Sequence, residues 1–80
     1  MNLESRLDRV IKAIRVCKKN LPPVIEAQTR LQEDLNMDSF EILMLINELE
    51  AEFNIHITDA DFVGVVTVGD VAHKLEQTSC

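Results

Sequence analysis

Ser39 is the residue of this sequence with the clearest potential for chemistry. Asp38 precedes it, and Glu41 stands three residues after Asp38, which is the spacing of a capping box at a helix start. A hydroxyl on the first residue of a helix lies near unpaired backbone N–H groups and the positive end of the helix dipole, which favour an anionic group such as a phosphate ester. The Asp-Ser pair by itself is also a common helix cap, so its meaning depends on its surroundings.

Three stretches with apolar residues at helical spacing accompany this serine. They predict helices over residues 3–18 and 39–53 and a last helix that is capped by Thr67 and reaches Leu75. The predicted buried faces are Leu3, Leu7, Val10, Ile11, Ile14 and Cys17; Ile42, Leu45, Ile46, Leu49 and Phe53; and Val68, Val71, Ala72 and Leu75. A short helical turn is expected over residues 58–62, and residues 63–66 are expected to be loop because no partner strand is evident.

The expected fold class is therefore all-α. We expect one domain over residues 1–80, a small antiparallel bundle of three main helices plus one short helix, with a long loop after the first helix. That loop, residues 20–37, holds both prolines and little periodicity. Because such a loop is uncommon in a small domain, we expect it to deliver a functional residue to the next helix start. Its expected core anchors are Val24, Ile25, Leu31 and Leu35.

The outward face of the helix over residues 39–53 is unusually apolar. Its members are Phe40, Met44 and Ala51, with Asn47 beside them and Glu41, Glu48 and Glu52 at the border. An apolar strip ringed by acids indicates a docking surface. The alternative is that loops cover Phe40 and Met44.

Charge is distributed unevenly along the chain. The net charge is −6, yet seven of the eight basic residues lie in residues 1–30. Residues 31–73 contain ten acids and no Lys or Arg. This block argues against a nucleic-acid surface, since phosphates must be neutralised by cations, and it suits partners that present Lys and Arg.

Several other classes of protein are disfavoured. No apolar run approaches the ~20 residues that span a bilayer, so no membrane insertion is expected. The first residues lack the build of a secretory signal, which predicts a cytoplasmic protein. Cys17 and Cys80 are too few and too distant for a disulfide framework or a zinc site, and Cys17 is expected at the edge of the core.

The run from Asp34 to Phe53 resembles the acyl carrier protein family, in which an Asp-Ser-Leu motif begins the second helix, as Asp38-Ser39-Phe40 does here. Similar segments continue the resemblance over about residues 25–75, at 29–35, 52–55 and 67–71. The resemblance implies that Ser39 receives 4′-phosphopantetheine from coenzyme A and that Asp38 caps the helix and helps a phosphopantetheinyl transferase place the serine. It also matches Glu41 and Glu50 to acids on the family's partner-binding helix, and the outward face described above adds Phe40, Met44, Asn47, Glu48 and Ala51 as expected partner-binding residues.

The resemblance also implies a monomeric carrier rather than an enzyme, holding acyl groups as thioesters for enzymes of fatty-acid, polyketide or related lipid biosynthesis that have basic docking patches. Some residues depart from the family pattern. Phe40 replaces a leucine, Met44 and Ala51 stand where acids are common, and Glu48 stands where a small residue is common. These departures indicate a specialised carrier with dedicated partners.

Other interpretations stay open. Asp38-Ser39-Phe40 also looks like the Asp-Ser-Phe of D-alanyl carrier proteins, one kind of aminoacyl or peptidyl carrier. An acidic interaction module without an arm is a more remote reading. A hydrolase triad of Ser39 with His56 or His73 lacks a G-x-S-x-G elbow. Residues 56–61 lack the third acid and the glycine of a calcium loop, so no metal site is expected.

Overall fold

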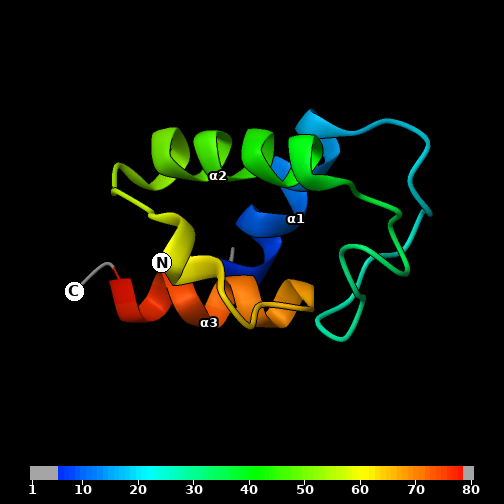
Figure 1. The fold of residues 1–80 in the computed structure, drawn as a ribbon. Coiled ribbons are helices and arrows are strands. Elements are labelled where there is room, and N and C mark those ends of the chain that lie inside the picture. The colour runs from blue at the N-terminus through cyan, green and yellow to red at the C-terminus, as the bar shows by residue number, and fades with distance from the viewer. Residues whose placement is uncertain (1–5, 79–80) are drawn as a thin grey trace.

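Three α-helices and one 3-10 turn form the regular structure of residues 6–78, the part of the chain that this computed structural model describes. The elements are α1 (Arg6–Cys17), α2 (Ser39–Phe53), η1 (Asp59–Phe62) and α3 (Val68–Thr78). The predicted all-α bundle is confirmed, but its fourth element is a single 3-10 turn and not an α-helix. In Figure 1, α2 and α3 run in the same direction, and α1 crosses behind them obliquely, from the level of α3 up to the start of α2. α1 contacts each of them, so it forms the centre of the packing.

α1 buries Val10, Ala13 and Ile14 along one stripe; Val10 and Ile14 belong to the predicted face, and Ala13 was not predicted. The helix was expected over residues 3–18, and it is observed over Arg6–Cys17. Leu3 lies outside the described residues. The backbone of Asn20 has a φ of 60°, and this left-handed conformation keeps the chain from continuing as a helix.

α2 has the predicted bounds, and it buries Leu45, Ile46 and Leu49. Asn54 ends the helix in the left-handed conformation (φ 55°, ψ 49°), with its N–H donating to the carbonyl of Glu50. Before α3, the Thr67 hydroxyl accepts a hydrogen bond from the backbone N–H of Asp70 at 3.1 Å. Thr67 therefore caps α3 as predicted.

The long loop is pinned to the segment before α3 by backbone hydrogen bonds. Leu31 N–H donates to the Val66 carbonyl at 2.9 Å, and Val68 N–H donates to the Thr29 carbonyl at 2.9 Å. These bonds flank an isolated antiparallel bridge between Arg30 and Thr67. Residues 63–66 themselves form no helix or strand, so the prediction of a loop there is confirmed. Ile25, Leu31 and Leu35 are buried anchors, but the expectation for Val24 was wrong, because its residue is 65% exposed. At this point of the loop the chain turns Ile25 into the core and leaves its neighbour Val24 facing solvent.

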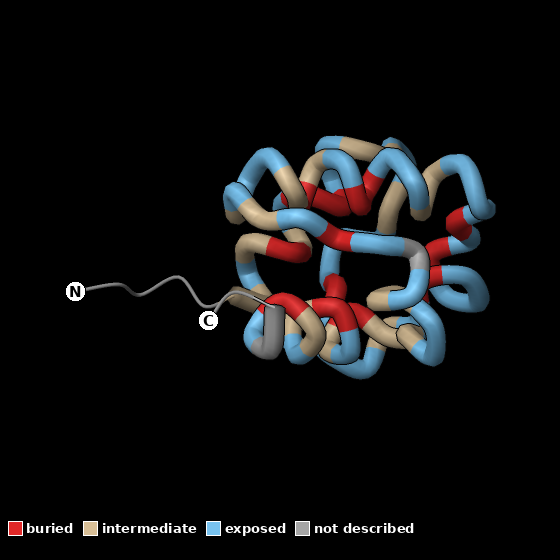
Figure 2. Tube along the Cα trace, turned by 60° about the vertical axis from the view of Figure 1, so that its left-hand side comes forward, coloured by how far each residue is buried: buried red, intermediate tan, exposed pale blue. Residues whose placement is uncertain are grey.

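The core is apolar throughout the described residues. Figure 2 shows the buried positions gathered on the inner sides of the helices and the loop. No buried polar or charged residue occurs among the described residues. Met37, two residues before Ser39, is 2% exposed, so the chain is fixed in the core immediately before α2 begins.

Candidate functional site

Ser39 is the first residue of α2, and it is exposed. Asp38 Oδ1 accepts a hydrogen bond from the backbone N–H of Glu41 at 2.9 Å, and Glu41 Oε1 accepts one from the backbone N–H of Asp38 at 3.1 Å. This is the complete capping box that the spacing predicted. Because the bonds hold the backbone on both sides of Ser39, its hydroxyl is presented from a well-defined position.

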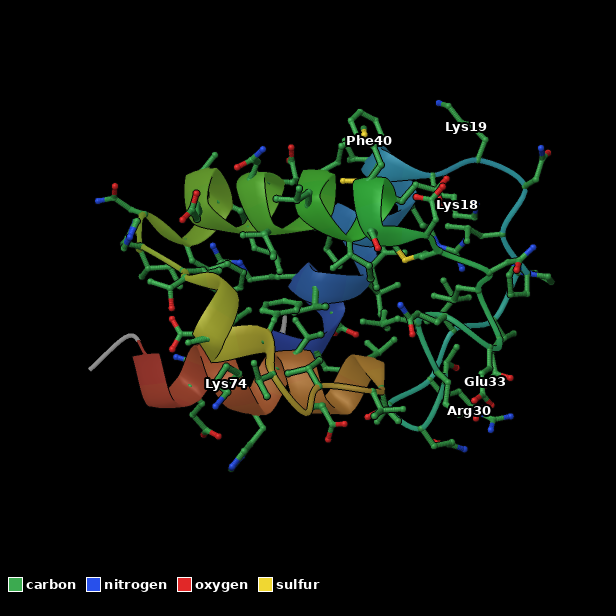
Figure 3. All side chains as sticks on the ribbon, viewed as in Figure 1. Lys18, Lys19, Arg30, Glu33, Phe40 and Lys74 are labelled. Atoms are coloured by element: carbon green, nitrogen blue, oxygen red, sulfur yellow. The ribbon has the colours of Figure 1, made fainter. Side chains whose placement is uncertain are left out.

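An ion pair braces the same helix start from α1. The ammonium of Lys18, the residue after α1, donates to Glu41 Oε1 at 3.1 Å and to Oε2 at 2.9 Å. The two side chains are only 20% and 24% exposed. Figure 3 shows Lys18 reaching toward the first turn of α2. Sequence reasoning missed this pair, because its members are 23 residues apart and meet only through helix packing.

The start of α2 suits an anionic group attached to Ser39. The Asp38 side chain caps the N–H of Glu41. The backbone N–H groups of Ser39 and Phe40, which precede Glu41 in the first turn, have no intrahelical partner and point out of the helix end. The helix dipole adds partial positive charge at the same place. A phosphodiester on the hydroxyl would therefore lie near donors that the fold leaves for it.

A mainly apolar groove of about 230 Å³ opens beside Ser39. α2 forms one wall, η1 another, and the long loop contributes a single amide side chain. The lining residues are Gln32, Ser39, Ile42, Leu43, Ile46 and Phe62. A flexible chain attached at Ser39 can thus lie against apolar side chains instead of water. Phe62 was not expected as a site residue, because only the packing of η1 against the bundle brings it beside α2.

The outward face of α2 is uncovered. Phe40 is 70% exposed and Met44 37%, so the alternative that loops cover them is wrong. Asn47 and Ala51 are also exposed, as predicted, and Leu43, which is 51% exposed, extends the apolar strip toward the groove. Figure 3 shows Phe40 projecting away from the bundle.

The acids at the border of this face are more constrained than their sequence positions indicate. Glu41 is half-buried and bound to Lys18. Glu48 is also half-buried, and it lies near the thiol of Cys17. Burial, and then the negative charge of Glu48, raise the pKa of Cys17, so this free thiol stays protonated near neutral pH. Cys17 is partly buried and packs against the core, so its predicted place at the core edge is confirmed. Cys80 lies outside the described residues.

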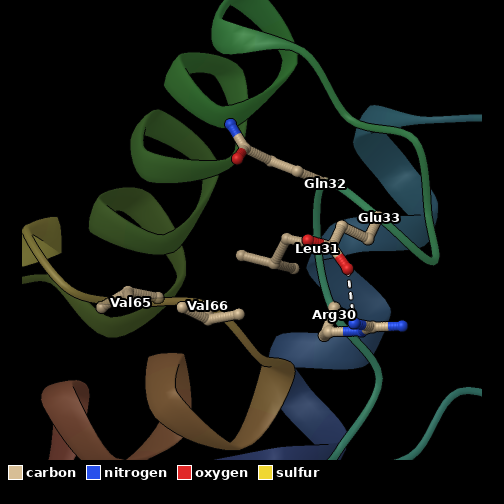
Figure 4. Close-up of a pocket in the computed structure, with 6 residues that line it drawn as sticks. All are labelled: Arg30, Leu31, Gln32, Glu33, Val65 and Val66. Carbon is tan, nitrogen blue, oxygen red and sulfur yellow. Dashed lines mark hydrogen bonds and ion pairs between the residues drawn. The ribbon is translucent and has the colours of Figure 1, made fainter.

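A second groove, of about 160 Å³, lies between the long loop and the segment before α3 (Figure 4). Its lining residues are Arg30, Leu31, Gln32, Glu33, Val65 and Val66. Arg30 pairs with Glu33 and with Asp34, and the hydrogen bond from Arg30 lowers the pKa of Asp34. The charges here are satisfied within the chain, and the groove does not include Ser39, so we assign it no part in the site.

The structure does not assemble the hydrolase triad. His56 follows the far end of α2, whose last residue lies about 21 Å along the helix from Ser39 at 1.5 Å per residue, and His56 contacts Glu50 at 3.5 Å. His73 lies on α3 beside Glu76 at 4.0 Å. Within the described residues, no group of three His, Cys, Asp or Glu side chains could hold a metal ion.

The match to known proteins agrees with this geometry. Residues 12–75 match the family model described as "Phosphopantetheine attachment site". An acyl carrier protein of Wolinella succinogenes is 36% identical over 67 residues, covering 82% of this chain and 88% of that protein. The chain belongs to the acyl carrier protein family.

Two further acyl carrier proteins are similar in sequence or structure. The protein of Thermotoga maritima is 32% identical over 53 residues, which cover 66% of this chain and 65% of that protein. A solved structure from Mycobacterium tuberculosis, assigned as an acyl carrier protein, superposes with a TM-score of 0.81 at 32% identity, covering 91% of this chain and 97% of that one. The fold and the sequence therefore lead to the same family.

Members of this family are carriers and not enzymes, and their prosthetic group is covalently attached 4′-phosphopantetheine. The group supplies a flexible arm that ends in a thiol. The residues at the start of α2 fit it: an exposed hydroxyl, a capped helix end with outward N–H groups, and an adjacent apolar groove. Family membership also implies a phosphopantetheinyl transferase and acyl-handling enzymes as partners. None of the described helices is both long enough and apolar enough to span a membrane.

Proposed function

We propose that Ser39 carries the 4′-phosphopantetheine arm and that the arm transports acyl groups as thioesters among enzymes of fatty-acid, polyketide or related lipid biosynthesis. The observation that carries this proposal is the exposed Ser39 hydroxyl at the capped start of α2, inside the matched region 12–75. Because coenzyme A must reach the Ser39 hydroxyl and the biosynthetic enzymes must reach the arm attached there, we also propose a cytoplasmic carrier that acts as a monomer and as one domain over residues 1–80.

Attachment of the arm is a phosphoryl-group transfer from coenzyme A. Ser39 Oγ forms a bond to the phosphorus that bears pantetheine, the pyrophosphate bond of coenzyme A breaks, and adenosine 3′,5′-bisphosphate leaves. A base of the transferase takes the hydroxyl proton. Asp38 serves this step by holding the helix start through its bond to Glu41 N–H, and we propose that the transferase also recognises its carboxylate.

Tethering is the physical basis of the transport. An acyl group on the arm stays at roughly millimolar effective concentration near any enzyme that the carrier contacts. The groove of about 230 Å³ beside Ser39 offers apolar walls to the arm or to its cargo between such contacts. The carrier thus needs only weak docking and makes no covalent bond to the acyl group with its own side chains.

The departures at Phe40, Met44 and Ala51 support a specialised carrier with dedicated partners. Rapid acyl exchange between the loaded protein and general fatty-acid synthase enzymes would argue against that specialisation. Phe40 directly after Ser39 also supports a second candidate, a D-alanyl or other aminoacyl carrier. Loading of the arm by an amino-acid-activating enzyme, compared with loading by an acyl-activating enzyme, separates the two cargo classes.

Intact mass tests the carrier function directly. The full chain is incubated with coenzyme A and a broad-range phosphopantetheinyl transferase, alongside Ser39→Ala and a control carrier. We expect a gain of one phosphopantetheine in the wild-type chain and none in the variant. If the wild-type chain gained nothing while the control carrier was modified, an acidic interaction module without an arm would become the better explanation.

A further inference from the structure

The start of α2 carries two carboxylates at the place where the proposed function puts an anion. Asp38 precedes Ser39, and the Glu41 side chain folds back to accept the Asp38 backbone N–H at 3.1 Å. A phosphodiester on Ser39 adds a further negative charge to this first helical turn. The outward N–H groups and the helix dipole favour that anion, whereas the two carboxylates oppose it. A cation at the same place would offset this opposition.

The sequence on either side of Ser39 supplies no such cation, since residues 31–73 contain no Lys or Arg. The cation comes from the residue after α1, because helix packing brings Lys18 to the first turn of α2 (Figure 3). The Lys18 backbone N–H donates to the Ile14 carbonyl at 3.0 Å, so it continues the helical hydrogen bonding of α1 by one residue. This bond fixes the point from which the Lys18 side chain extends.

The Lys18 ammonium binds the carboxylate that completes the capping box. It lies 3.1 Å from Glu41 Oε1 and 2.9 Å from Glu41 Oε2. The two side chains are 20% and 24% exposed, so salt screens this pair less than it screens an exposed one. The next residue, Lys19, is exposed, and its side chain projects away from the bundle in Figure 3. Of these two neighbouring lysines, Lys18 is thus the one whose charge lies at the start of α2.

The stability of the fold is a weak explanation for this pair. Desolvation of two partly buried charges offsets much of their attraction, so replacing both partners together is often neutral. Removal of one partner alone is costly, because the other charge is then left without compensation. What distinguishes the pair is its place beside Ser39, where the charge of Glu41 bears on any anion attached to the hydroxyl.

We propose that Lys18 is a positioning residue for the arm: by offsetting the charge of Glu41, it allows the start of α2 to hold the phosphodiester on Ser39. Glu41 can then close the capping box without repelling the anion beside it. This inference rests on the proposed function, because it requires the arm on Ser39. It assigns to α1 a part in a site whose other charged groups all belong to the segment around Ser39.

The experiment compares the stability of each full-length chain without the arm (apo) and with it (holo). The variants are Lys18→Gln, Glu41→Gln and the double variant, with Lys19→Gln as the matched control because it removes the same charge one residue away. The side chain introduced by Glu41→Gln can still accept the Asp38 N–H, so the capping box remains. Each chain is loaded to completion with coenzyme A and a broad-range phosphopantetheinyl transferase, as verified by intact mass. Urea unfolding at about 50 mM NaCl, followed by far-UV circular dichroism, then gives the folding equilibrium constant of both forms.

The readout is the difference between the holo and the apo chain, because a structural role alone would lower the stability of both forms equally. Relative to wild type, Lys18→Gln should reduce the folding constant of the holo chain about fivefold more than that of the apo chain. Glu41→Gln should shift the difference by a similar factor in the opposite direction. The two shifts should cancel to within about twofold in the double variant, and Lys19→Gln should also stay within about twofold. The Lys18→Gln shift should shrink at about 1 M NaCl, where the screening length is ~3 Å.

Equal losses in the holo and the apo form of Lys18→Gln would overturn the inference, and so would a Lys19→Gln shift as large as that of Lys18→Gln. If Lys18→Gln does not fold, Glu41→Gln and the double variant decide, and an unchanged difference between holo and apo Glu41→Gln would then refute the role of Lys18. If the wild-type chain takes up no arm while a control carrier is modified, the proposed function itself fails, and this inference with it.

Discussion

Replacing Asp38 with alanine tests how the helix start holds Ser39 in place. The variant loses the acceptor for the Glu41 N–H, a bond of 2.9 Å. Loss of an N-cap costs about 0.5–2 kcal/mol, and typically ~1 kcal/mol. The alanine still donates its own backbone N–H to Glu41 Oε1, so one half of the capping box remains. We therefore expect a loss of about 1 kcal/mol in the free energy of unfolding, which lowers Tm by about 4–8 °C in a domain of this size.

The matched control is Asp38→Asn, because an asparagine side chain caps a helix about as well as aspartate does. Urea unfolding followed by far-UV circular dichroism should show a lower midpoint with an unchanged slope for Asp38→Ala, and a nearly wild-type midpoint for Asp38→Asn. Equal destabilisation by both variants, or no shift in Asp38→Ala, would refute the argument from the cap. Arm attachment in Asp38→Asn then isolates recognition of the carboxylate, since its helix start is intact.

Three further predictions concern stability. Leu49→Ala, at a fully buried position of α2, should lower the free energy of unfolding by about 2–5 kcal/mol in urea unfolding, whereas a loss below about 1 kcal/mol would contradict the packing described. Gly69→Ala should lower the unfolding midpoint, because the added Cβ would lie 3.1 Å from a carbonyl oxygen of the long loop; an unchanged or higher midpoint would show that the loop yields without strain. Hydrogen bonds from two backbone N–H groups lower the pKa of Asp70, so its contribution to stability is present above pH ~4 and is lost as pH falls through the lowered pKa. Asp70→Asn should therefore weaken the dependence of unfolding on pH below about 4, and an unaltered acid profile would contradict this assignment.

The local features of the site could be predicted from the sequence because they depend on neighbours along the chain. Asp38, Ser39 and Glu41 form their capping box within four residues, and Thr67 and Asp70 repeat the pattern before α3. The bounds of α2 followed from the same cap together with apolar residues at helical spacing. The position of Ser39, the proposed attachment site, at a helix start is thus a property of a short segment.

Surface and core assignments within the loop were less predictable. Val24 and Ile25 have similar side chains, yet only Ile25 is buried. Hydropathy could not choose between them, because the choice depends on which side of the loop faces the bundle. The turn at residues 59–62 was expected as a short helix, but whether four residues close as an α-turn or a 3-10 turn depends on packing beyond the local sequence.

What the sequence by itself determined was the family, the helix caps and the place of Ser39, since each is written in contiguous residues. What only the tertiary structure decided were the relations between distant residues: the pair of Lys18 with Glu41, the groove that Phe62 closes beside α2, and the uncovered Phe40. Composition showed a long acidic block, but the fold pairs Glu52 with Arg9 of α1 and Glu41 with Lys18, the residue after α1. Local sequence carries no record of such pairs, because ion pairs and grooves form only when packing brings separate segments together.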